Sequence, residues 1–291
     1  MSRPDWRPTA RVLVDGLDHP EGVCWDPEAE RLYAGGEAGQ IYAGTLDGEF
    51  AQVATVPGLV LGVAVDGAGR VLACASSDGS LCVVEDGASR RLLTEVDGRP
   101  LVLPNYAAFG PDGTLWLSDS GTWKADDGRL VALLPDGSAH TVSDRLPRFP
   151  NGLAVSADGG TLYVVESLGP GVSAVDLTTP GAPPVDVVRL PGTVPDGLAV
   201  LADGSLLISC YRPDQILHLA LDGTLTVVAR DPEGTLLAAP TNICLAGPAL
   251  DVLVAANLNR WHLTRLDAGF VGAPPHRPRR WAVDALPAAP G

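Results

Sequence analysis

Four oxygen-bearing side chains recur at nearly regular intervals along the chain. Glu21, Asn105, Asn151 and Asp196 each stand at the start of a short apolar run, and Leu61 and Thr241 begin two further runs of the same kind. Carboxylate and amide oxygens are the ligands that hard divalent cations prefer. If folding brings these four residues together, they can hold one divalent cation.

The spacing of these starts, at positions 21, 61, 105, 151, 196 and 241, is typical of a propeller or another repeat array. Each repeat contains further apolar runs separated by turn sequences such as Asp158-Gly159-Gly160 and Asp203-Gly204. Four short antiparallel strands over such a length form one blade. The sequence predicts an all-β, single-domain, six-bladed β-propeller with four-stranded antiparallel blades. The blades are expected at about 18–56, 57–97, 98–144, 145–190, 191–231 and 232–269.

The two ends of the repeat series predict how the ring closes. Arg11–Val14 resembles the fourth strand of a blade but has no blade of its own, whereas the last repeat lacks a fourth strand. An N-terminal strand at 10–16 is therefore expected to complete blade six and to remove an exposed sheet edge. Residues 271–291 are predicted to form a loosely packed C-terminal tail.

Blade topology predicts that all the leading residues meet around the axis on one face. Two carboxylates, Glu21 and Asp196, would then repel each other and raise each other's pKa unless a cation lay between them. An all-oxygen ligand set favours Ca²⁺, with Mg²⁺, Mn²⁺ and Zn²⁺ as alternatives. The competing interpretation is that these asparagines and acids are ordinary turn residues.

Loops after the second strand of each blade are expected to surround the same mouth. The residues predicted to contact a substrate are Asn105, Tyr106, Asp119, Glu166, Arg212 and Asn242. Tyr106 and Trp123 are expected either to line a less polar pocket at the mouth or to serve ordinary packing.

Composition excludes several classes of function. The chain has 20 Lys+Arg against 35 Asp+Glu, a net charge of −15 that disfavours nucleic acid and anionic membranes as partners. Five cysteines without metal-type spacing fit a reduced, cytoplasmic protein. Neither a secretory signal nor a membrane span is expected, because no suitable apolar segment is present. We expect a monomer or weak homo-oligomer that acts on a small molecule.

Four segments resemble the SMP-30/gluconolactonase/LRE family of six-bladed propellers, and the resemblance extends over about residues 11–268. The segments are His19-Pro20-Glu21-Gly22, Phe149-Pro150-Asn151-Gly152-Leu153-Ala154, Pro195-Asp196-Gly197 and Pro240-Thr241-Asn242. The resemblance implies that Glu21, Asn151 and Asp196 hold one divalent cation, with Asn105 as a fourth ligand or a substrate contact. It also implies that Asp196 is a general base for lactone hydrolysis, with phosphotriester hydrolysis as a related activity.

Two departures from the family pattern predict a less polar substrate than a sugar-acid lactone. Leu103 stands where animal members have an arginine, and Tyr106 stands where bacterial relatives often have Asp or Gly.

Catalysis by a Ser/His/Asp triad is disfavoured because the chain contains no GxSxG motif. Two alternatives are a non-catalytic, metal-stabilised propeller that binds a ligand or protein and a metal-free propeller of the strictosidine-synthase-like kind, which the recurring oxygen ligands argue against.

Overall fold

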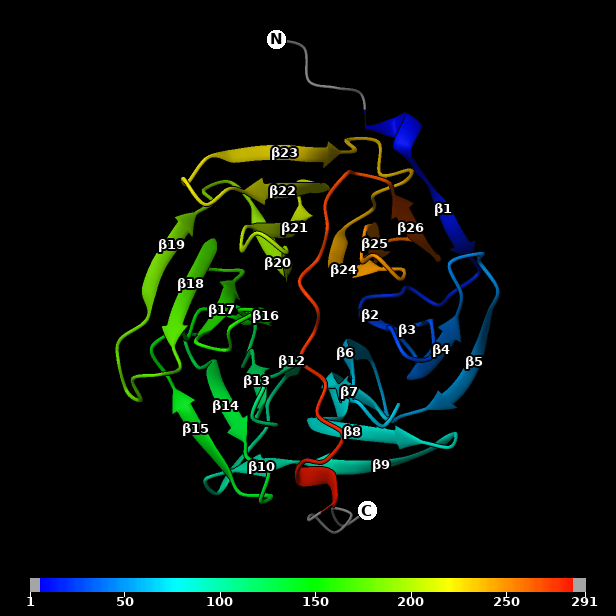
Figure 1. The fold of residues 1–291 in the computed structure, drawn as a ribbon. Coiled ribbons are helices and arrows are strands. Elements are labelled where there is room, and N and C mark those ends of the chain that lie inside the picture. Colours follow the sequence, from blue (N-terminus) through cyan, green and yellow to red (C-terminus); the bar gives the residue numbers. More distant parts are fainter. Residues whose placement is uncertain (1–5, 285–291) are drawn as a thin grey trace.

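The computed structural model describes residues 6–284 of the 291-residue chain. These residues form a six-bladed β-propeller whose blades are four-stranded antiparallel sheets arranged around a central axis (Figure 1). This confirms the predicted fold class. Within the described part of the chain, no helix is both long enough and apolar enough to cross a membrane.

The first three blades each use four consecutive strands. Blade one contains β2 (Val23–Asp26), β3 (Arg31–Gly35), β4 (Gln40–Gly44) and β5 (Phe50–Thr55). Blade two contains β6 (Val60–Val65), β7 (Val71–Ala75), β8 (Ser80–Glu85) and β9 (Ala88–Leu93). Blade three contains β12 (Pro104–Phe109), β13 (Leu115–Asp119), β14 (Arg129–Leu133) and β15 (Ala139–Ser143). A small hairpin of β10 (Glu95–Val96) and β11 (Arg99–Pro100) connects blades two and three.

Blades four and five follow the same plan. Blade four contains β16 (Pro150–Val155), β17 (Thr161–Glu166), β18 (Gly171–Asp176) and β19 (Val185–Arg189). Blade five contains β20 (Val194–Val200), β21 (Leu206–Arg212), β22 (Gln215–Leu219) and β23 (Leu225–Arg230). The core lies between neighbouring blades, where for example Ile41 of blade one packs with Val63 and Ala73 of blade two.

Blade six joins the two ends of the repeat series. It contains β24 (Pro240–Ala246), β25 (Val252–Asn257) and β26 (His262–Leu266), and β1 (Ala10–Asp15) is its outer strand. β1 runs antiparallel to β26, in a register that pairs Ala10 with Leu266 and Asp15 with His262. The predicted closure of the ring by the N-terminal strand is confirmed.

Residues 271–284, which we name the strap, cross the face of the propeller that carries the tight turns between first and second strands (Figure 1). The strap begins at blade six, where the Gly272 N–H donates to the Leu250 carbonyl, 2.8 Å away. In blade five the Ala273 N–H donates to the Val200 carbonyl, 3.0 Å away. His276 Nε2 then lies 2.9 Å from a backbone carbonyl of blade four.

The strap ends against blades one, two and three. Arg277 forms an ion pair with Asp26 of blade one at 2.7 Å and donates to the backbone carbonyl of Asp66 in blade two. The Trp281 indole N–H donates to the Asp66 carboxylate at 2.8 Å, and its ring packs edge-on against Phe109 of blade three. The strap therefore contacts all six blades.

The expectation of a loosely packed tail is wrong for residues 271–284. Trp281, Ala282 and Val283 are buried in the same cluster as residues of blades two and three. The rest of the predicted tail, residues 285–291, lies outside the described residues.

Replacing Trp281 by alanine should destabilise the protein strongly. The side chain is only 2% exposed, and truncating a buried aromatic ring costs about 3–5 kcal/mol. In a chain of this size that corresponds to a fall in Tm of roughly 10 °C. Trp123→Ala is the matched control, because Trp123 is 51% exposed and should lower Tm much less. Equal shifts in differential scanning calorimetry would show that the strap adds no stability.

Candidate metal centre

In most blades, the pairing between the first and second strands shifts register close to the residue that leads the repeat, such as Asn105 or Asp196. The pairing registers of β12, β16, β20 and β24 shift there, between Pro104 and Tyr106, for example, and between Pro195 and Leu198. A β-bulge interrupts the alternation of side chains and changes the direction in which a residue points. The irregularities therefore occur where the axial side chains must leave the sheet and turn towards the axis.

Glu21 and Asp196 are the two acids that meet near the axis, and they are only 3% and 7% exposed. Burial, together with the negative charge of Asp196, raises the pKa of Glu21 well above its ordinary value. Asn242 opposes this shift by donating from Nδ2 to Glu21 Oε2 at 3.2 Å. Burial raises the pKa of Asp196 to about 7, although a hydrogen bond from Asn151 opposes the rise. The repulsion between these two acids that the sequence predicts is therefore present.

Four oxygen atoms in this cluster are buried without a hydrogen-bond donor among the described residues. They are Oδ1 of Asn105, Asn151, Asp196 and Asn242. A buried acceptor that is left unpaired is costly, so such atoms in proteins almost always have a partner. A divalent cation satisfies amide and carboxylate oxygens together and neutralises two neighbouring acids. The residues present therefore fit a hard cation.

Two serines orient the amide groups. Asn105 Nδ2 donates to Ser120 Oγ at 2.9 Å, and Asn151 Nδ2 donates to Ser167 Oγ at 3.1 Å. Each serine hydroxyl then donates to the carbonyl of the proline that opens the next blade. Because each amide nitrogen is used in this way, each amide oxygen remains available at the axis.

Sequence reasoning did not assign this orienting role to either serine. Ser120 and Ser167 follow their asparagines by 15 and 16 residues. Their shared place in the repeat was the signal that could have found them.

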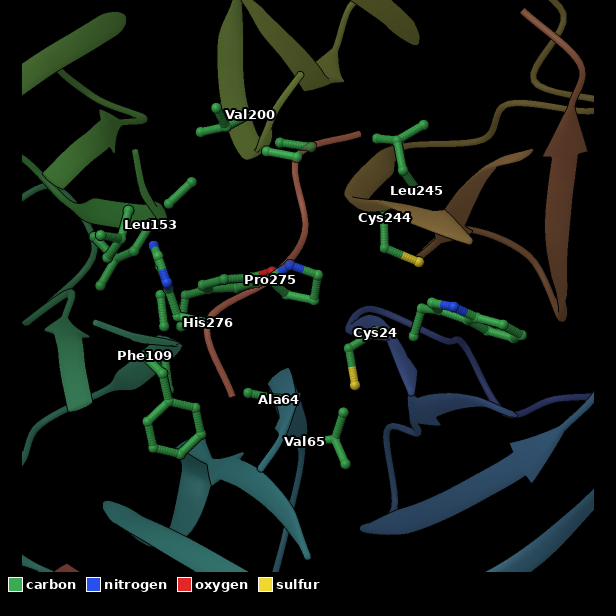
Figure 2. A pocket seen from close by; sticks show the side chains of 18 of the residues that line it. Cys24, Ala64, Val65, Phe109, Leu153, Val200, Cys244, Leu245, Pro275 and His276 are labelled. Atoms are coloured by element: carbon green, nitrogen blue, oxygen red, sulfur yellow. The ribbon is translucent and has the colours of Figure 1, made fainter. Parts of the chain in front are cut away.

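Asn242 and Tyr106 occupy the position after the leading residue, where the other four blades have glycine. Asn242 is fully buried and joins the axial cluster through Glu21. Tyr106 instead lines the channel on the strap side, with Cys24 and Cys244, and burial raises its pKa above the ordinary value. The ring therefore lines a pocket on the strap side (Figure 2) and packs against the core, and its contact with a substrate stays a prediction.

Three other predicted contact residues have structural partners of their own. Asp119 is buried against Arg129, 3.0 Å away, and accepts two backbone N–H groups from the loop before β12. Glu166 accepts a backbone N–H from the loop before β16, and burial raises its pKa. Arg212 pairs with Asp214 beside a hollow of about 590 Å³ formed by loops of blades five and six. Their contact with a substrate stays a prediction.

A polar cluster that the sequence did not reveal lies in the loops that lead to Glu21 and follow β3. His19 Nδ1 lies 3.1 Å from Asp18 Oδ1 and 3.1 Å from Glu37 Oε2. The imidazole also packs against the half-exposed Trp261 ring, with centroids 5.3 Å apart. These contacts fix the segment that leads into Glu21.

The stability of metal-free protein should fall as the pH rises from about 4 to above 7. Folded Asp196 keeps its proton up to a pKa of about 7, whereas an unfolded aspartate loses it near 4. The unfolded state therefore binds fewer protons across this window, and stability is lost through it. We expect a decrease on the order of a few kcal/mol in urea unfolding.

A bound cation takes the place of the proton, so saturating CaCl₂ should stabilise the protein more at pH 8 than at pH 5. Asp196→Asn is the control and should lose the part of this pH dependence that comes from Asp196, while Glu21, whose pKa burial also raises, keeps its own part. A flat profile between pH 4 and 7 in chelated wild-type protein would contradict the assignment.

The fold and the axial cluster define a six-bladed propeller with an oxygen-lined site on its axis. The sequence model of the SMP-30/Gluconolactonase/LRE-like region matches residues 19–257. The chain therefore belongs to this family, and the resemblance stated from the sequence is confirmed. A search of curated protein sequences gives no significant match.

Solved structures support the fold. A gluconolactonase from Xanthomonas campestris is 23% identical, with a TM-score of 0.76 and 88% of each chain covered. Regucalcin from Agrobacterium tumefaciens, a calcium-binding protein, is 18% identical, with a TM-score of 0.76 and coverage of 93% of this chain and 97% of that one. A luciferin-regenerating enzyme is 19% identical, with a TM-score of 0.73 and coverage of 91% and 96%.

Proposed function

We propose that the protein is a divalent-metal-dependent hydrolase that opens a lactone at the axial site. The observation that carries this proposal is the group of buried, unpartnered amide and carboxylate oxygens around two acids on one axis. The family match supports it, as do the structural likenesses to proteins described as a gluconolactonase and as calcium-binding.

Each axial residue has a distinct task in this proposal. Glu21, Asn105, Asn151 and Asp196 would hold the cation, with Ca²⁺ preferred. The cation supplies Lewis-acid polarisation of the lactone carbonyl when bound. Asp196 accepts a proton from the attacking water and returns it to the ring oxygen as the acyl carbon–oxygen bond breaks, which gives a hydroxy acid.

A second candidate is a non-catalytic propeller in which the cation is structural. The low exposure of the axial side chains favours it, since none of the residues Glu21, Asn105, Asn151, Asp196 and Asn242 is more than 7% exposed. Catalytic metal sites keep a position open for water or substrate, whereas structural sites are closed. Activity measurements separate the two candidates.

The direct test combines metal analysis with a panel of lactones. Purified protein should carry about one cation per chain, and chelation should abolish hydrolysis, which readdition of Ca²⁺ should restore. Metal-free protein that is fully active would refute the mechanism. Protein that binds one cation tightly but hydrolyses no lactone would support the structural candidate.

Hydrophobic γ- and δ-lactones should be better substrates than gluconolactone. Leu103 stands two residues before Asn105, and two apolar side chains in the loops before β12 and after β13, Val102 and Trp123, are about half exposed. Apolar contacts of this kind change kcat/KM by roughly tenfold or more. Measured kcat/KM values for an alkyl-substituted δ-lactone and for gluconolactone test this, and a clear preference for gluconolactone would contradict it.

We also propose that the protein works in the cytoplasm on small molecules, as a monomer or weak homo-oligomer. The five cysteines are free thiols, which fits a reducing compartment. The net charge of −15 disfavours nucleic acid and anionic membranes as partners. Sedimentation analysis and fractionation of the producing cell would test these two points.

A further inference from the structure

Three metal-ligating side chains lie together in two loops outside the axial site. They are Asp18, His19 and Glu37, which we name the rim cluster, and one ligand atom of each lies within 4.8 Å of the other two. In the described part of the chain, no other group of three or more His, Cys, Asp or Glu side chains meets this distance. The loops lie before β2 and after β3, on the face opposite the strap. The three side chains are 32%, 31% and 59% exposed, so a cation can reach them from solvent.

The spacing of these ligand atoms suits one small divalent cation. His19 Nδ1 lies 3.1 Å from Asp18 Oδ1 and 3.1 Å from Glu37 Oε2. Ligand atoms about 2.0–2.1 Å from a tetrahedral Zn²⁺ are roughly 3.3 Å from one another. A cation can therefore bind the imidazole nitrogen and both carboxylate oxygens after small side-chain movements, and water can complete the tetrahedron on the exposed side.

Neighbouring groups hold the Asp18 carboxylate in the orientation of a ligand. Its Oδ2 accepts from Gln40 Nε2 at 2.9 Å and from the Ala38 N–H at 3.2 Å, so Oδ1 is the oxygen that faces His19. The Asp18 carbonyl accepts the Glu37 N–H at 3.0 Å, which connects the two loops. Hydrogen bonds of this kind orient the ligands in metal sites and tune their affinity.

The His19 ring is also held in place. It packs against the Trp261 ring, with centroids 5.3 Å apart. The His19 backbone has a φ of +41°, in the left-handed region, which a residue other than glycine adopts at a cost in free energy. These two features direct Nδ1 at the two carboxylates and leave the imidazole little freedom to turn away.

Charge balance favours a divalent cation in the rim cluster. Among the described residues, Asp18 and Glu37 have no ion-pair partner other than His19. A protonated imidazole balances only one of the two negative charges. A divalent cation bound to a neutral imidazole balances both, and it uses the ring nitrogen as a ligand.

We propose that the rim cluster is a second metal site, distinct from the axial site, which binds Zn²⁺ through His19 Nδ1 and one oxygen each of Asp18 and Glu37. Imidazole with carboxylates suits Zn²⁺ and related transition metals, whereas Ca²⁺ takes oxygen ligands. The two sites therefore select different cations. The axial site offers only amide and carboxylate oxygens, and the rim cluster adds a nitrogen.

Zn²⁺ uptake by Ca²⁺-saturated protein tests this site. Isothermal titration with ZnCl₂ should show about one Zn²⁺ bound at the rim cluster of each chain, and excess CaCl₂ should not displace it. The side-chain NMR signals of His19 should shift on binding. Co²⁺ in place of Zn²⁺ should give the strong visible absorption of a four-coordinate ion.

His19→Asn removes the imidazole nitrogen, and asparagine tolerates the same backbone conformation. It should weaken Zn²⁺ binding by more than about a hundredfold, because the loss of an outer-shell partner alone costs roughly 10–100-fold. Gln40→Ala removes such a partner and should fall within that range. His140→Ala is the matched control, because His140 is an exposed histidine of β15 outside the rim cluster, and it should bind Zn²⁺ like wild type.

Glu37→Gln is the second ligand variant, for the case that His19→Asn does not fold. It keeps the shape of an exposed side chain and removes one charge from the cation, so Zn²⁺ affinity should fall here as well. The difference in uptake between wild type and either variant counts the rim site even where Zn²⁺ also enters the axial site.

Equal Zn²⁺ uptake by wild type and His19→Asn, or His19 signals that do not respond to Zn²⁺, would overturn the proposal and leave an ordinary ion pair. The measurements follow metal uptake rather than hydrolysis. Inactive protein that shows this uptake would therefore count against lactone hydrolysis alone. Active protein without it would count against the rim site alone.

Discussion

Replacement of Asp196 by asparagine is expected to lower kcat for lactone hydrolysis by roughly 10²–10⁴, the range for losing a general base. The asparagine keeps an oxygen for the cation but cannot accept a proton at neutral pH. It also removes one of the two buried acids that repel each other at the axis. Metal content should therefore stay measurable while turnover falls, as steady-state kinetics and metal analysis of the same sample would show.

Glu21→Gln is the matched control for this prediction. It has the same shape as wild type and also removes one charge from the cation site, but it leaves Asp196 in place. Metal affinity should fall, and excess Ca²⁺ should recover much of the activity, which it should not do for Asp196→Asn. An Asp196→Asn variant with wild-type turnover would refute the proton-transfer role.

Deletion of residues 1–16 is expected to remove most of the stability of the closed ring. It removes β1, whose pairing with β26 runs from Ala10–Leu266 to Asp15–His262, and leaves β26 as an exposed edge. Exposed edges pair with other chains, so the truncated protein should aggregate. Its Tm should fall by more than about 10 °C, given roughly 2–4 °C for each kcal/mol in a chain of this size.

Val12→Thr is the control for the deletion, because it keeps the strand backbone and changes a side chain that is substantially exposed. It should stay monomeric, with a Tm close to that of wild type. Light scattering and calorimetry would measure both properties. A truncated protein that is soluble with unchanged Tm would contradict the role of β1 in closure.

Much of the fold could be predicted because each blade repeats local signals. Turn sequences such as Asp203-Gly204 separate apolar runs, and Gly204 adopts the positive φ that favours glycine. For example, the apolar run Arg31–Ala34 forms most of β3 (Arg31–Gly35), and the run Gln215–Leu219 forms β22. Local turns and apolar runs define these strands, so they can be recognised in the sequence without knowledge of distant contacts.

The strap could not be predicted because its packing depends on residues far away in the sequence. Trp281 donates to Asp66, which lies 215 residues earlier. Its proline-rich composition resembles that of an exposed linker, and only the ring geometry shows which side chains become buried. The β10–β11 hairpin was missed for a similar reason, since its short strands are held by backbone carbonyls that accept from Arg129.

The axial site was predictable in its residue types but not in its orientations. The register of the repeats predicted that Glu21, Asn151 and Asp196 would converge. The repeat register did not predict that Tyr106 would line the channel on the strap side while Asn242, at the equivalent position, would contact Glu21. The partners of Asp119 and Arg212 depend on loop conformations that the register of the repeats does not predict.

The position of the strap at the C-terminal end of the described chain sets an order for assembly during synthesis. All six blades leave the ribosome before residues 271–284, and domains fold largely as their residues emerge. A nascent chain can therefore pair β1 with β26 before the strap covers the channel. The strap, once it has emerged, then covers the channel from the side of the tight turns and contacts all six blades.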